Sequence, residues 1–158
     1  MTKNLGVGII GCGNISTAYL SLAPMFKGYE IVAVADLNMD TARAQADKFD
    51  VRADTVDDLL AATDVDLVIN LTIPAAHVAV SRSILQAGKH VYSEKPFVLS
   101  LAEAQELGDL AKANGLRIGS APDTFMGGSH QLARNMIDAG EIGKVASGAA
   151  VVMSSGME

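Results

Sequence analysis

Short apolar runs alternate along the chain with longer stretches whose apolar residues recur at helical spacing. The runs that predict strands are Leu5–Ile10, Glu30–Ala35, Asp66–Leu71, His90–Tyr92 and Arg117–Ser120, with a weak, short candidate near Val51. Regular strand–helix alternation is typical of βαβ units with right-handed crossovers. The pattern therefore predicts a doubly wound, mostly parallel α/β sheet.

The predicted helices have recognisable ends. Thr55 with Asp58, and Ser100 with Glu103, have the spacing of a capping box ahead of an apolar stretch. Gly88 follows the helix that precedes the fifth strand, where a glycine readily ends a helix in the left-handed conformation. These signals place helices between the strands.

After Ser120 the pattern changes. The apolar side of one more helix, which ends at Gly140, consists of Leu132, Met136 and Ile137. The segment Lys144–Met153 then predicts one long strand, and no partner strand follows it. Such a strand exposes unpaired backbone groups along both edges. We therefore expect it to be disordered, paired with a second copy, or part of a longer polypeptide, and we favour the last.

Two overlapping segments match a G-x-G-x-x-G loop. Gly6-Val-Gly8-Ile-Ile-Gly11 fits the letters but leaves almost no preceding strand. Gly11-Cys-Gly13-Asn-Ile-Ser16 has serine in the third place, yet it follows the strand Leu5–Ile10 and opens a helix. We choose the second register, because a dinucleotide loop needs a strand before it and a helix after it.

Each position in this loop has an expected role. Gly11 permits the tight turn, Gly13 lets a pyrophosphate approach the backbone, and the small Ser16 keeps helix and sheet close. The amides of Asn14 and Ile15 are expected to face the phosphates at the helix N-terminus. The pattern predicts a dinucleotide-binding Rossmann domain.

An acidic residue strengthens this interpretation. Asp36 ends the second strand, 20 residues beyond Ser16, where a carboxylate can accept hydrogen bonds from both adenosine ribose hydroxyls. The same charge repels a 2′-phosphate, and neither Leu37 nor Asn38 offers an arginine or serine to bind one. Arg43 is a weaker counter-candidate. We expect NAD(H) as cofactor in preference to NADP(H).

The chain as a whole resembles the Gfo/Idh/MocA oxidoreductases. The motifs that carry the resemblance are Gly8–Ser16, Ala33–Asp36, Thr72-Ile-Pro74 with His77, Ala87–Val91, Glu94-Lys-Pro96 and Ile137–Gly143. The resemblance implies a nicotinamide-dependent dehydrogenase or reductase of a sugar, cyclitol or related polyol or keto compound. It also implies homo-oligomers, because the family's second domain forms much of the substrate pocket and often the oligomer interface.

The resemblance divides the chain into two parts. Residues 1–122 are expected to form the dinucleotide-binding domain. Residues 123–158 are expected to be the first helix and strand of a truncated second α/β domain, for substrate binding and oligomerisation. Asp123 and Thr124, which follow the sixth strand, are candidates for the substrate side.

The resemblance also assigns roles around Lys95. Its ammonium would stabilise charge on the reacting oxygen and share in proton transfer, whereas spacing alone would make it a surface lysine. Glu94 would help to place Lys95 and the nicotinamide ribose, and the bond before Pro96 is a candidate cis bond. The residues expected to line the cofactor after the fourth strand are Thr72, Pro74 and His77.

Composition narrows the function classes. The 158 residues carry a net charge of −6, no Trp and no basic cluster, which argues against a nucleic-acid partner. No apolar run is long enough for a membrane span or a signal peptide, and the lone Cys12 fits a reducing cytoplasm. No residue cluster suggests a metal. A non-catalytic dinucleotide-binding module, such as a redox sensor or scaffold, is the alternative to the enzyme.

Overall fold

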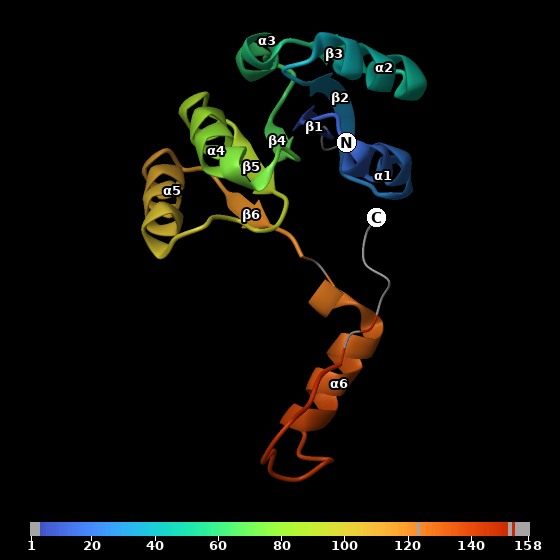
Figure 1. The fold of residues 1–158 in the computed structure, drawn as a ribbon, viewed down its shortest axis with the longest axis vertical. Helices are drawn as coiled ribbons and strands as arrows, with labels where there is room; N and C mark the ends of the chain where they lie inside the picture. The colour runs from blue at the N-terminus through green and yellow to red at the C-terminus, as the bar shows by residue number, and fades with distance from the viewer. Residues whose placement is uncertain (1–3, 123, 152, 154–158) are drawn as a thin grey trace. The chain divides into compact units, whose positions relative to one another are not determined.

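Six parallel strands form a single sheet in the computed structural model, which describes residues 4–122, 124–151 and 153. The strands are β1 (Leu5–Ile10), β2 (Tyr29–Ala35), β3 (Arg52–Asp54), β4 (Leu67–Asn70), β5 (His90–Ser93) and β6 (Ile118–Ser120). Their order is β3-β2-β1-β4-β5-β6, with every neighbouring pair parallel (Figure 1). The expected doubly wound Rossmann sheet is confirmed.

Helical segments connect the strands and follow the last one. They are α1 (Asn14–Leu22), η1 (Ala23–Met25), α2 (Met39–Phe49), α3 (Val56–Ala61), η2 (Pro74–Ala76), α4 (His77–Gln86), α5 (Leu101–Ala113), η3 (Thr124–Met126) and α6 (Gly128–Asp138). The N-cap hydrogen bonds of both expected capping boxes are present. The Thr55 hydroxyl accepts a hydrogen bond from the Asp58 amide at 3.1 Å, and Ser100 accepts one from Glu103 at 3.3 Å.

The sheet has an apolar layer on each face. On one face Ile9 packs with residues of α1 and α2, among them Leu20. On the other, Ile10 packs with residues of α3, α4 and α5, among them Leu107. Successive side chains of a strand point to opposite faces, so the continuous apolar run in β1 supplies both layers. Figure 1 shows α4 and α5 beside β5 and β6.

The chain divides into two compact units, Met1–Ala121 and Pro122–Glu158. The second unit contains η3 and α6, and Gly140 has a positive φ of 75° just after α6. The strand expected over Lys144–Met153 is wrong for the residues described there, 144–151 and 153, none of which is in a strand. Strand propensity takes effect only when another strand pairs with the segment, and none does so within the described part of the chain. The identity of this unit as the start of a substrate domain stays a prediction.

Candidate dinucleotide-binding site

The strand order reverses between β1 and β4, and this is where a doubly wound sheet opens a crevice at its carboxyl edge. Gly11 follows β1 at this point with φ +103°. A Cβ on Gly11 would lie 2.7 Å from the carbonyl oxygen of Leu71, which follows β4. Its amide donates a 2.9 Å hydrogen bond to the Ala35 carbonyl at the end of β2. Gly11 is therefore required by the backbone conformation and by the close approach of neighbouring strand ends.

The glycines of the rejected loop register have a packing role. A Cβ on Gly6 would lie 1.8 Å from the Asp64 carbonyl oxygen, and one on Gly8 would lie 2.9 Å from the Leu59 side chain. Both positions fall within β1. The chosen register, with β1 before the loop and α1 after it, is confirmed.

Gly13 differs from these glycines, because a Cβ there would meet no protein atom within 4 Å. It is the N-cap of α1, whose first turn has neither a side-chain cap nor an acidic residue. Asn14 and Ile15 are exposed at this end, while Ser16 is fully buried and its hydroxyl donates a 2.6 Å hydrogen bond to the Gly13 carbonyl. An uncapped helix N-terminus with an open approach is well suited to an anion such as a pyrophosphate.

The Asp36 carboxylate lies beside this loop. One oxygen accepts a hydrogen bond from the Cys12 amide at 2.8 Å, and the other accepts one from the Asn38 amide at 2.9 Å. Arg43, the counter-candidate for a 2′-phosphate, forms an ion pair with Asp40 at 3.2 Å. The acid that would bind the ribose thus also holds the glycine loop against the end of β2.

Cys12 has no nucleophilic role in this geometry. Its thiol is buried and lies 3.5 Å from the Ala35 carbonyl oxygen. Burial, with a smaller contribution from the Asp36 charge, raises the pKa of the Cys12 thiol to about 11. The thiol is therefore neutral at physiological pH, whereas nucleophilic chemistry requires the thiolate.

A buried amide organises the loop after β4. Asn70 is completely buried, and its side-chain nitrogen donates to the His77 carbonyl at 3.0 Å and to the Ser81 hydroxyl at 3.1 Å. Its side-chain oxygen accepts hydrogen bonds from both the amide and the hydroxyl of Thr72, at 3.2 and 2.7 Å. Our reading of the sequence missed Asn70, although an amide at the end of an otherwise apolar strand is a signal, because buried polar groups need partners.

Glu94 joins two parts of the site. One carboxylate oxygen accepts a 3.0 Å hydrogen bond from the Tyr19 hydroxyl of α1, and the other accepts one from the Lys95 amide at 2.9 Å. The Lys95 side chain is exposed, and its ammonium has no partner among the described residues. The Glu94-Lys-Pro96 motif after β5 thus contacts α1, the helix that begins at the glycine loop. The same motif presents the unpaired ammonium of Lys95. The sequence alone assigns Tyr19 no role, because nothing in the local pattern pairs it with Glu94.

His77 is the first residue of α4 and is 1% exposed. Its Nδ1 lies 2.7 Å from the Pro96 carbonyl oxygen and its Nε2 lies 2.9 Å from that of Thr72. The expected cofactor contact of His77 stays a prediction, since both ring nitrogens face the protein. Pro74 is exposed in η2, and the Lys95–Pro96 bond is cis, as considered from the sequence.

The matched family model is described as an oxidoreductase family with an NAD-binding Rossmann fold, and it covers residues 5–121. The chain belongs to this family. It is 36% identical over 148 residues to an inositol 2-dehydrogenase of Salmonella paratyphi B, covering 89% of this chain and 43% of that protein. The chain therefore spans less than half the length of this relative.

Solved structures of similar proteins include both cofactor types. A 3-ketoreductase from Actinomadura kijaniata, in complex with TDP-benzene and NADP, has a TM-score of 0.84 at 28% identity over 90% of this chain and 46% of its own. GenD2 from gentamicin A biosynthesis, in complex with NAD, has a TM-score of 0.83 at 25% identity over 89% of this chain and 41% of its own. These neighbours establish an NAD(P)-type fold without separating NAD from NADP.

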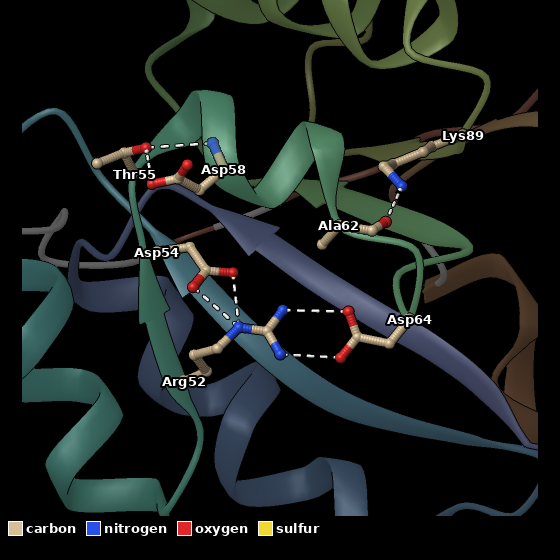
Figure 2. A network of polar contacts seen from close by, with 7 residues as sticks. All are labelled: Arg52, Asp54, Thr55, Asp58, Ala62, Asp64 and Lys89. Atoms are coloured by element: carbon tan, nitrogen blue, oxygen red, sulfur yellow. Dashed lines mark hydrogen bonds and ion pairs between the residues drawn. The ribbon is translucent and has the colours of Figure 1, made fainter.

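The motif Ala87–Val91, one of those through which the chain resembles its family, lies at the amino edge of the sheet, opposite the candidate site. Lys89 precedes β5 and is 6% exposed. Its ammonium donates to the Ala62 carbonyl at 2.6 Å (Figure 2) and to the Val65 carbonyl at 2.8 Å. Burial lowers the pKa of Lys89. In the same view Arg52 forms an ion pair with Asp64 at 2.8 Å. This motif lysine therefore supports the fold by binding the end of α3 and the approach to β4.

The remaining predicted residues lie at the start of the second unit. Thr124 opens η3 and is exposed. Asp123 lies outside the described residues. Among the residues described, no group of three or more His, Cys, Asp or Glu side chains could hold a metal ion, and no helix is long and apolar enough to cross a membrane.

Proposed function

We propose that the carboxyl edge of this sheet binds NAD(H) and takes part in hydride transfer to or from a sugar, cyclitol or related polyol or keto compound. The observation that carries the proposal is that the open Gly13 N-terminus, the Asp36 carboxylate and the free Lys95 ammonium belong to loops that follow three parallel strands at one edge. The relatives' names, inositol 2-dehydrogenase and 3-ketoreductase, support this substrate class.

The residues divide the work in this proposal. The first-turn amides of Asn14 and Ile15 bind the pyrophosphate, and Asp36 accepts the ribose hydroxyls. Thr72 and Pro74 line the nicotinamide side, where the bound cofactor supplies or accepts the hydride. Lys95 donates a hydrogen bond to the substrate oxygen and stabilises the charge that changes there. Glu94 positions Lys95 through its amide.

NAD(H) is the cofactor we propose in preference to NADP(H). The Asp36 carboxylate would repel a 2′-phosphate, and the next residue, Leu37, is 97% exposed and offers no positive charge. Arg43 is engaged by Asp40. Titration with NADH and NADPH in parallel tests this, and tighter NADPH binding would overturn it.

We further propose a cytoplasmic, homo-oligomeric protein whose Asp123 and Thr124 face the substrate.

A matched pair of glycine variants tests cofactor binding. Gly13→Ala and Gly108→Ala both place a methyl group in space that no protein atom occupies within 4 Å, and neither glycine has a positive φ. Both variants should therefore fold. We expect Gly13→Ala to weaken NADH binding roughly tenfold or more, because the methyl group fills the space for the pyrophosphate. Gly108→Ala should bind as the parent does. Equal affinity in all three proteins would refute the assigned site.

Turnover is measured separately from binding. NAD⁺ reduction is followed with a panel of cyclitols, sugars and other polyols, and NADH oxidation with the corresponding ketones. Binding together with turnover supports the oxidoreductase, and Lys95→Ala should lower that turnover on the order of 10²-fold or more. If the complete native protein binds NADH but turns over no member of the panel, the non-catalytic dinucleotide-binding module is favoured.

A further inference from the structure

The His77 ring connects two loops of the candidate site. It is almost completely buried, and each ring nitrogen lies within hydrogen-bond distance of a main-chain carbonyl. The carbonyl at Nε2 belongs to Thr72, after β4, and the one at Nδ1 belongs to Pro96, after β5. These are the loops that carry the proposed cofactor-lining residues and Lys95.

The chemistry of the contacts makes the ring difficult to replace. A carbonyl oxygen only accepts hydrogen bonds, so each bond must come from the imidazole. A neutral ring donates one of them, and a doubly protonated ring donates both. Hydrogen bonds to both loops therefore require a proton on each ring nitrogen, and the bond to the Pro96 carbonyl requires one on Nδ1. A flexible side chain with one polar end cannot bond both carbonyls.

The surroundings of His77 hold it in place. Asn70 donates to the His77 carbonyl at 3.0 Å and accepts from the Thr72 amide and hydroxyl. The Glu94 amide donates to the Asn70 carbonyl at 2.9 Å. The start of α4, the Thr72 loop and the turn at Lys95 are therefore linked through one buried polar network.

We propose that His77 is a positioning residue that fixes the turn at Lys95 relative to the cofactor-lining loop at Thr72. The inference rests on the proposed hydride-transfer function, since it assigns His77 no contact with substrate. By holding the Pro96 carbonyl, His77 restricts the backbone immediately after Lys95. Misplacing a catalytic group by about 1 Å can cost on the order of 10²-fold in rate.

Two variants distinguish a role of His77 in positioning Lys95 from a role in the stability of the fold alone. His77→Leu removes both ring contacts, and Lys89→Met removes the two carbonyl contacts of a buried cation at the opposite edge. Both should lower the free energy of unfolding. Only His77→Leu should lower kcat, by about tenfold or more at saturating NAD(H) and substrate, with a smaller change in the cofactor Kd. A kcat within about twofold of the parent for folded His77→Leu, or an equal loss in Lys89→Met, would overturn the proposal.

A second measurement, by NMR, requires no enzyme turnover and no substitution of His77. The chain has three histidines, so His90→Gln and His130→Gln assign the His77 signals in spectra of protein with ¹⁵N-labelled histidine rings. The ring should show fixed protonation of its nitrogens and an N–H proton protected from solvent exchange. Rapid tautomer averaging with an unprotected N–H would overturn the link. A fixed ring in a protein without hydride transfer would instead refute the proposed function while leaving the link intact.

Discussion

Two lysines lie at opposite ends of β5, and they differ in burial and in hydrogen bonding. Lys89, before the strand, is buried and its ammonium donates to two main-chain carbonyls. Lys95, after the strand, is exposed, and its ammonium has no partner among the described residues. Both belong to motifs through which the chain resembles its family. The lysine at the amino end of β5 supports the fold, whereas we propose that the one at its carboxyl end is available to a ligand.

The largest effect is expected at Lys95. In the full-length enzyme, Lys95→Ala should lower kcat for hydride transfer on the order of 10²-fold or more, as expected for the loss of a positioned proton-transfer or charge-stabilising group. Cofactor affinity and unfolding free energy should change little, because the ammonium has no partner to lose within the described part of the chain. Steady-state kinetics and chemical denaturation check this, with Lys112→Ala, an exposed lysine on α5, as the control. Turnover that survives within a few-fold would remove the catalytic role.

The reverse pattern is expected at Lys89. Lys89→Met leaves the carbonyls of Ala62 and Val65 without their donor, and an unsatisfied buried polar group costs about 1–3 kcal/mol. Denaturation should show a loss of that size, while NADH affinity and the kcat of the folded protein remain near the parent values. A stable variant with impaired turnover would show that the amino edge contributes to the chemistry.

The fold and the candidate site could be predicted only in part from the sequence. The register of the glycine loop and the two N-caps were predicted correctly, and the ends of the five main strands to within one residue, because each depends on residues close together in the chain. The contacts of Tyr19 with Glu94 and of His77 with Pro96 join residues 75 and 19 positions apart, so they arise only from the fold. The strand expected over Lys144–Met153 was wrong for the described residues 144–151 and 153, because a strand depends on neighbours that the local pattern does not specify.

A smaller effect is expected from Asp36→Ala. The substitution removes the proposed ribose acceptor together with the carboxylate that binds the Cys12 and Asn38 amides. NADH affinity should fall roughly tenfold, which corresponds to about 1.4 kcal/mol, and discrimination against NADPH should decrease. Parallel calorimetric titrations with the two cofactors check this. Unchanged selectivity would show that Asp36 holds the loop without contacting the ribose.

The smallest effect concerns pH. Burial lowers the pKa of Lys89 in the folded chain from its ordinary value of 10.5, so the unfolded chain binds more protons between the two pKa values. Unfolding free energy should therefore gain a positive contribution from Lys89 as pH rises through that interval, and lose it as pH falls through the folded-state pKa. The contribution should be absent in Lys89→Met. Identical pH profiles for the two proteins would contradict the assigned burial effect.

Amide hydrogen exchange with and without NADH tests the division between the two edges most directly. We expect added protection at Asn14, Ile15 and Asn38 and in the loops at Thr72 and Glu94, all at the carboxyl edge, with no change over residues 62–66 or at Lys89. Protection centred on the amino edge, or no protection at saturating NADH, would contradict the placement of the cofactor site.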